Sequence, residues 1–322
     1  MRNHKTSLWL LPVVAIAAIA IFLLLRKSDA KAGTWQHDEG FVFGTVYNIT
    51  YRHGENLQAE IEAELKKVDG EFSMFNEHST VARINRGDSL VERSAMFREV
   101  YDMAQRVTAD TQGAFDITVA PLVNAWGFGF KHEQLPTKEQ VDSLLQIRSQ
   151  MDFAAIAKGY GCDVVARLLK SRGISDYMVE IGGEIAIHGT NPSDAPWRVG
   201  VNKPVDDSLS VSGELLAVLK LSDVCLATSG NYRNFYYKGG RKYAHTIDPR
   251  TGYPVQHEVL SATVLADNCA TADAYATAFM VLGLDSTRAV LQRHPEMKAY
   301  LIYTDQDNDY AVWHSPGMDI EP

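Results

Sequence analysis

The sequence predicts an α+β fold in which mixed, largely antiparallel sheets carry packed helices. Segments with apolar residues at helical spacing and segments of alternating polarity follow one another without the strict strand and helix alternation of a doubly wound sheet. No internal repeat and no convincing domain boundary interrupts the chain. Its 322 residues, 46% of them hydrophobic, are enough for one large core.

An uncharged segment near the N-terminus, residues 8–25, predicts a membrane anchor or an export signal. As a helix it would reach about 27 Å at 1.5 Å per residue, close to the thickness of a bilayer core. Ser28 and Ala30 also fit a small-residue cleavage site. We therefore expect residues 1–32 to be a signal anchor or signal segment with a linker. Residues 33–322 would form one domain on the periplasmic side of the cytoplasmic membrane.

The first half of this domain predicts one strand followed by three helices. Residues 41–53 alternate apolar and polar side chains, as a half-buried strand does. The second helix is expected to end near Gly113, and Thr137 with Gln140 fits a capping box for the third. The apolar residues at helical spacing are Leu57, Ile61, Leu65 and Val68, then Met96, Val100, Met103 and Val107, then Val141, Leu144 and Leu145.

The second half predicts two further helices and several strands. One helix directly follows DFAAIAKGYGCD, residues 152–163, and is expected to stop at Gly173. The other is CATADAYATAFMVLG, residues 269–283. The strand-like runs are YMVEIGGEIAIHG, WRVGVN, ELLAVLKL, KYAHTI, VLSATVLA, YLIYT and YAVWH. Ser229 and Gly230 in ATSGNYRNF fit the N-cap of a short helix.

Charge and cysteine content exclude some classes of protein. The formal net charge is -9 and no run of lysine or arginine is present, which argues against a nucleic-acid-binding protein. The three cysteines, Cys162, Cys225 and Cys269, are widely spaced and odd in number. They predict neither a disulfide framework nor a zinc site, and we expect all three to be small buried residues.

Lys158 stands among glycines and small apolar residues at the start of a predicted helix. A helix N-terminus with glycines offers backbone N–H groups to an anion, and a lysine adds a positive charge. Lys158 and Gly159 therefore fit a phosphate site, although a solvated lysine is the commoner explanation of such a pattern. Asp273 and Thr277 lie at i and i+4 on one helix face, and such oxygen ligands suit magnesium. The alternative is one exposed acid and an ordinary buried threonine.

Two further segments carry side chains that fit a role in catalysis or ligand binding. His245 lies in KYAHTIDPRTGYP and fits either a proton shuttle or a structural histidine. GAFDITVAPLVNAWGFG combines Asp116 with Phe115, Trp126 and Phe128, which would hold a flat ring or form part of the core. No HExxH, G-x-S-x-G or CxxC pattern is present.

Taken in order, eight blocks of the sequence resemble the ApbE family, the FAD:protein FMN transferases, from about Phe41 to Leu284. The blocks are FGTVYNITY, FSMFNEHSTVARIN, GAFDITVAPLVNAWGFG, DFAAIAKGYGCD, VEIGGEI, ATSGNY, HTIDPRTGYP and ADAYATAFMVLG. The resemblance implies an enzyme that binds FAD, cleaves its pyrophosphate with Mg²⁺ and transfers FMN to a threonine hydroxyl through a phosphoester, releasing AMP. The implied acceptors carry a Ser/Thr-Gly-Ala-Ser/Thr-type motif in membrane or exported redox subunits.

The same resemblance assigns roles to single positions. FAD contacts are implied for Asp152 and Lys158, and flavin-site positions for Phe72, Ala114, Phe115, Asp116 and Ile247. Magnesium ligands are implied for the backbone oxygen of Ala155 and the side chains of Asp273 and Thr277. His245 matches a histidine important to activity. We expect Lys158 to stabilise the transition state, and Asp273 or His245 to activate the threonine, a choice that the sequence leaves open.

Two positions depart from the family pattern. Phe43 replaces the methionine of the opening block, and its ring would still stack on the adenine or the flavin. His78 replaces the acid before Ser79. Two rival functions remain open at this stage: hydrolysis of FAD to FMN and AMP in the same site, and storage of FAD without turnover.

Overall fold

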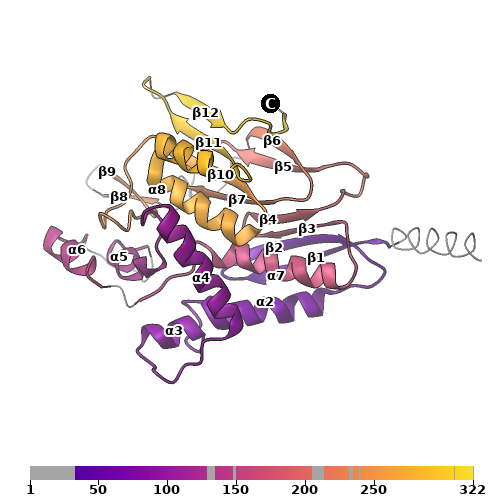
Figure 1. Cartoon of the computed structure of the whole chain (residues 1–322), viewed down its shortest axis with the longest axis horizontal. Coiled ribbons are helices and arrows are strands. Elements are labelled where there is room, and N and C mark those ends of the chain that lie inside the picture. Colours follow the sequence, from indigo (N-terminus) through magenta and orange to yellow (C-terminus); the bar gives the residue numbers. More distant parts are fainter. Residues whose placement is uncertain are drawn as a thin grey trace, which may run out of the picture.

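The computed structural model describes residues 33–128, 135–147, 150–204, 214–231, 235–238, 241–307 and 309–321. Within these ranges the chain forms an eight-stranded sheet covered by helices, a three-stranded sheet and a two-stranded ribbon (Figure 1). All neighbouring strands in the three sheets run antiparallel. The predicted α+β fold with largely antiparallel sheets is confirmed.

The large sheet brings together strands from both ends of the chain. In spatial order its strands are β1 (Trp35–Val42), β2 (Thr45–Arg52), β3 (Tyr177–Ile181), β4 (Glu184–His188), β7 (Cys225–Gly230), β10 (Val259–Ala266), β11 (Lys298–Thr304) and β12 (Tyr310–His314). The small sheet has β13 (Ile320–Glu321), β6 (Leu215–Leu221) and β5 (Trp197–Asn202), and the ribbon has β8 (Phe235–Lys238) and β9 (Arg241–Ala244).

Helices cover the large sheet, and two of them matter most for the site. α7 (Ala157–Ser171) packs against β3, β4 and the helix α2 (Gln58–Phe72), while α8 (Cys269–Arg293) packs against β7 and β10. α7 and α8 also pack against each other (Figure 1). The other helices are α3 (Thr80–Asn85), α4 (Ala95–Asp110), the 3₁₀ turn η1 (Ile117–Val119), α5 (Ala120–Ala125) and α6 (Lys138–Leu144).

Several predicted helix ends are confirmed. Gly113 and Gly173 follow α4 and α7 with φ of 79° and 75°, the left-handed region in which glycine has no Cβ penalty. The capping box of α6 is complete, because the Thr137 side chain accepts from the Gln140 amide and the Gln140 side chain accepts from the Thr137 amide. These signals are local, so the sequence was sufficient to find them.

Three sequence expectations need correction. The single strand predicted for residues 41–53 is a hairpin, since Phe43 and Gly44 have φ of 51° and 75° and turn the chain between β1 and β2. Ser229 lies inside strand β7, where its backbone pairs with β10 in the middle of the large sheet, so within the described residues it is a strand residue and not an N-cap. α8 continues beyond Gly283, where φ of 74° marks a kink instead of the predicted end.

The predicted membrane segment lies in residues 1–32, outside the described residues. Among the residues that are described, no helix combines the length and the apolar character required to cross a membrane.

The main core lies between the large sheet and the helices, where α4, α7 and α8 meet β7 and β10. The three cysteines belong to a second part of the core, between α2, α7 and the strands β2 and β3: Cys162 and Cys269 are fully buried, Cys225 nearly so, and all three are free thiols. The expectation of small buried residues is therefore confirmed for each of them.

Candidate active site

A buried group of charges joins the first turn of α7 and the second turn of α8 to the start of β4. Lys158 Nζ lies 3.1 Å from Glu184 Oε1 and 3.7 Å from Asp273 Oδ2. Asp273 is 2% exposed and Glu184 is 4% exposed, whereas the Lys158 side chain keeps 27% of its surface open. One ammonium thus faces two buried carboxylates and remains accessible from one side.

Burial shapes the protonation of all three groups. Burial raises the pKa of Asp273, and it raises the pKa of Glu184 to about 8, while the nearby ammonium opposes both shifts. Burial alone would lower the pKa of Lys158, but the two carboxylates raise it above its usual range. Lys158 is therefore a fixed positive charge, which suits a group that has to hold a phosphate.

Glu184 has an unmet hydrogen-bonding capacity that the sequence did not reveal. Its Oε2 is buried and has no hydrogen-bond partner within the described residues. Glu184 follows a tight turn in which Gly182 and Gly183 have φ of 65° and 103°, and this turn directs it toward α7. The block VEIGGEI was recognised in the sequence, but nothing in the block indicated that its last acid would reach Lys158.

Gly159 allows α7 and α8 to approach one another at this site. A Cβ on Gly159 would lie 2.3 Å from the carbonyl oxygen of Cys269, closer than any real contact. The Gly159 amide donates to Asp273 Oδ2 at 3.1 Å. This corrects one expectation, because the amide that was expected to be open to a phosphate is used to hold Asp273.

A second acid, Asp163, fixes the register of the two helices. Its oxygens accept hydrogen bonds from the amides of Cys269 and Ala270 at 2.7 and 2.9 Å, the first two residues of α8. Free amides at a helix start favour a carboxylate, so Asp163 caps α8 from the side of α7. The one-turn spacing of α8 then carries Asp273 to its place beside Lys158.

The predicted magnesium ligands offer a consistent set of hard oxygen donors. Asp273 supplies a buried carboxylate, and the Thr277 hydroxyl lies 3.1 Å from the Ser229 hydroxyl on β7. The Ala155 carbonyl receives no hydrogen bond in the described part of the chain, since the Gly159 amide goes to Asp273. One carboxylate with neutral oxygens fits Mg²⁺, which commonly completes its shell with substrate phosphates and water.

No cluster of three or more histidine, cysteine or acidic residues suited to a metal occurs in the described ranges. The donor set around Asp273 is not of that kind, because it contains a single acid. Such a site would be incomplete until the phosphates of a substrate arrive.

Most of the predicted flavin-site side chains are buried. Phe72, Ala114, Phe115 and Ile247 are each at most 5% exposed. The Phe72 ring packs 5.0 Å from that of Phe153 in the core, and its predicted flavin contact stays a prediction.

Two acids border this flavin segment. Asp116 Oδ1 accepts from the amide and the hydroxyl of Thr118 at 2.8 and 2.7 Å and so caps the 3₁₀ turn. The Asp152 amide donates to the Ile117 carbonyl at 2.7 Å, which joins the Lys158 segment to the flavin segment. Burial raises the pKa of Asp152. Asp152 and the segment with Asp116 are therefore neighbours in space.

An aromatic cavity of about 210 Å³ lies beyond the flavin segment. Trp126 stacks on Tyr243 with ring centroids 5.8 Å apart, and its indole N–H donates to the Gly252 carbonyl at 2.7 Å. His245 is half-buried, with its ring 6.4 Å from that of Phe128. His245 thus belongs to the aromatic side of the site.

Phe43, which replaces the family methionine, rests on α7. A Cβ on Gly161 would lie 2.7 Å from Phe43 Cε2, so the ring covers the small surface that this glycine leaves. Phe43 is half-buried and contacts both parts of the core. The expectation that it stacks on a ring of FAD stays a prediction.

Residues 43–301 match the ApbE family. This chain belongs to the ApbE family. The FAD:protein FMN transferase of Vibrio cholerae is 36% identical over 325 residues, which cover 92% of this chain and 96% of the relative. The FAD:protein FMN transferase of Escherichia coli K12 is 33% identical over 339 residues, which cover 94% and 95%.

Solved ApbE structures have the same fold. The flavin transferase ApbE from Vibrio cholerae superposes with a TM-score of 0.78 at 33% identity and covers 88% of this chain and 98% of its own. The apo form of the Pseudomonas stutzeri flavinyl transferase ApbE gives 0.75 at 29% identity, covering 88% and 95%. The predicted family and the predicted enzyme class, a flavin transferase, are confirmed.

Proposed function

We propose that this ApbE protein transfers FMN from FAD to a threonine hydroxyl of another protein, with Mg²⁺, and releases AMP. The observation that carries the proposal is the Lys158 ammonium, which is held between the carboxylates of Asp273 and Glu184. Asp273 lies one turn before Thr277 on α8. A positive charge and oxygen donors for a cation at one place suit a pyrophosphate, and the relatives named above support FAD as its source.

In the proposed reaction the threonine oxygen attacks the FMN phosphorus, the pyrophosphate bond breaks and AMP departs with its phosphate. Asp273, Thr277 and the Ala155 carbonyl would hold Mg²⁺, whose charge offsets the negative charge on the leaving oxygen. Lys158 would bind a phosphate oxygen and orient the pyrophosphate. The hydroxyl proton has to pass to a base. His245, half-buried on the aromatic side, is more accessible to an incoming hydroxyl than the enclosed Asp273.

We also propose where this reaction takes place. Residues 8–25 would anchor the chain in the cytoplasmic membrane, with residues 33–322 on the periplasmic side. The acceptors would be membrane redox-complex subunits with a Ser/Thr-Gly-Ala-Ser/Thr-type motif. Protease treatment of spheroplasts should digest the domain, and a domain that survives until the cells are lysed would contradict this placement.

The function is tested by mixing the full chain in mild detergent with FAD, Mg²⁺ and a test protein that carries the motif. We expect in-gel flavin fluorescence and an FMN-sized mass gain that require Mg²⁺ and disappear when the motif threonine is alanine. Free FMN and AMP without labelled protein would favour hydrolysis. Intact FAD with every acceptor would favour a binding protein.

Lys158→Met is expected to weaken FAD binding at least about tenfold, because a charge-assisted contact to phosphate is lost. The measurement is a titration of flavin fluorescence with enzyme, without acceptor. Lys170→Met is the matched control, since Lys170 is an exposed lysine near the other end of α7. Thermal unfolding of both variants shows whether they fold. Unchanged affinity in a folded Lys158→Met protein would return Lys158 to a structural role.

A further inference from the structure

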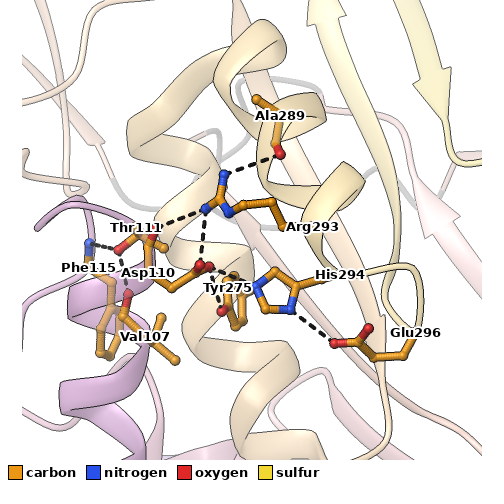
Figure 2. Close-up of polar contacts among 9 residues, drawn as sticks. All are labelled: Val107, Asp110, Thr111, Phe115, Tyr275, Ala289, Arg293, His294 and Glu296. Atoms are coloured by element: carbon orange, nitrogen blue, oxygen red, sulfur yellow. Dashed lines mark hydrogen bonds and ion pairs between the residues drawn. The ribbon is translucent and has the colours of Figure 1, made fainter.

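A polar junction joins the end of α4 to Tyr275 in the first half of α8 and to Arg293 and His294 at its C-terminal end (Figure 2). Asp110, the last residue of α4, accepts from the Tyr275 hydroxyl at 2.9 Å and from Arg293 Nη2 at 3.0 Å. His294 Nε2 lies 3.0 Å from Asp110 Oδ2. We call these four residues the Asp110 junction. Tyr275 is buried and Asp110 and His294 are half-buried, whereas Arg293 is exposed, so the Tyr275 and His294 contacts are the ones shielded from water.

The junction lies directly beside the predicted flavin segment. Thr111 caps α4 by donating to the Val107 carbonyl at 2.7 Å, and its hydroxyl accepts from the Phe115 amide at 3.2 Å (Figure 2). Gln112 and Gly113 both have positive φ and return the chain sharply to this cap. The segment Ala114–Asp116 is therefore held by the last turn of α4, the same turn that Asp110 bonds to α8.

On its other side the junction reaches the predicted metal ligands. Tyr275, whose hydroxyl bonds Asp110, stands in α8 between Asp273 and Thr277. A movement of the α4 terminus away from α8 would therefore change the distance between the flavin segment and the metal ligands. In the described residues α4 and α8 pack directly on each other, and the junction is the polar part of this contact.

We propose that the Asp110 junction is a positioning device that sets the place of Ala114–Asp116 relative to Asp273 and Thr277 and thereby tunes FAD affinity. The proposal rests on the proposed function of the site. The four residues of the Asp110 junction do not touch the reacting atoms. They act through the flavin segment and are therefore positioning residues.

The chemistry of His294 makes this device sensitive to pH. Its Nδ1 lies 3.0 Å from Glu296 Oε1 and its Nε2 faces Asp110, so two carboxylates need two N–H donors, which only the imidazolium provides. Burial acts to lower the pKa of His294, but the hydrogen bonds to Glu296 and Asp110 raise it. The junction is complete below this raised pKa and loses one hydrogen bond as the pH rises through it.

The charged and titratable groups that face His294 come from the two helices that meet at the junction, α4 and α8, and from the segment after α8. Asp110 comes from α4, Tyr275 and Arg293 come from α8, and Glu296 follows α8. Arg293 keeps its charge over the whole range, so deprotonation of His294 weakens the junction without abolishing it.

The test compares wild type, Asp110→Asn and His294→Gln by FAD titration without acceptor and by KM and kcat for transfer. We expect Asp110→Asn to weaken FAD affinity about fivefold and to change kcat at saturating FAD less than about twofold. In wild type FAD affinity should fall as the pH rises through the raised pKa of His294, and His294→Gln should make this dependence less steep. Glu321→Gln is the control, because Glu321 also binds two cations, Arg198 and Lys220, but lies in the small sheet.

Each outcome decides the proposal. Unchanged FAD affinity in Asp110→Asn, or a pH dependence in His294→Gln as steep as in wild type, would overturn it even if wild type transfers FMN normally. Glu184, which titrates beside Lys158, contributes a pH dependence that both proteins share. If Asp110→Asn fails to fold, His294→Gln alone decides, because it leaves the Arg293 pair in place. A wild type that binds FAD but transfers nothing overturns the proposed function and leaves the titrations to test the junction.

Discussion

Replacing Asp273 with asparagine is expected to reduce FMN transfer at least about 100-fold, the scale seen when one essential electrostatic group is removed. Asparagine keeps an oxygen that can accept from the Gly159 amide, so the contact between α7 and α8 survives. The lost charge removes the only acid of the predicted metal site and one of the two carboxylates beside Lys158. The readout is covalent flavin on the acceptor protein.

The control for this variant is Asp285→Asn on the same helix. The Asp285 side chain is 96% exposed and its only ion pair with Arg288 is long, at 3.8 Å, within the described residues. The Asp285→Asn variant should transfer FMN as wild type does. A Mg²⁺ titration followed by thermal unfolding separates metal loss from misfolding. Mg²⁺ should raise the unfolding temperature of wild type, and this rise should be absent in Asp273→Asn. Normal transfer by Asp273→Asn would remove Asp273 from the metal site.

Gly159→Ala is expected to lower the free energy of unfolding by about 3 kcal/mol, the upper range for overpacking a tight interior. The new methyl group would meet the Cys269 carbonyl at 2.3 Å and the Ala270 Cα at 2.9 Å, both backbone atoms that cannot turn aside. α8 would have to move away from α7 and take Asp273 with it. Chemical denaturation measures the loss, and FMN transfer should fall together with it.

Gly70→Ala is the matched control for this substitution. Gly70 lies inside α2, and a Cβ there would meet nothing within 4 Å. Alanine has the higher helix propensity, so this variant should gain about 0.5–1 kcal/mol. Equal effects of the two substitutions would show that propensity, and not the close approach of α7 and α8, controls Gly159.

The sequence predicted well those features that depend on neighbours along the chain. The capping box at Thr137, the stops at Gly113 and Gly173 and the shared helix face of Asp273 and Thr277 all follow from spacings of a few residues. The family blocks also named the correct fold and enzyme class.

What the sequence missed depends on contacts between distant segments. Glu184 reaches Lys158 only because β4 lies beside α7, and Ser229 meets Thr277 only because β7 lies under α8. The turn at Phe43 was missed because a phenylalanine rarely adopts a positive φ, and the glycine after it, Gly44, was read as part of the strand. Gly159 looked like an anion-binding glycine because its packing partner lies in another part of the sequence.

The distance along the chain between α7 and α8 has a consequence for folding. The hydrogen bond from Gly159 to Asp273 spans 114 residues, and the cap from Asp163 to Cys269 spans 106. Contacts of such high sequence separation form only after the chain between them has been organised, here the strands β3 to β10. Lys158 therefore gains Asp273 as a partner late. A ligand that needs this site should leave the folding rate unchanged and slow unfolding, so bound ligand would report that a chain has finished folding.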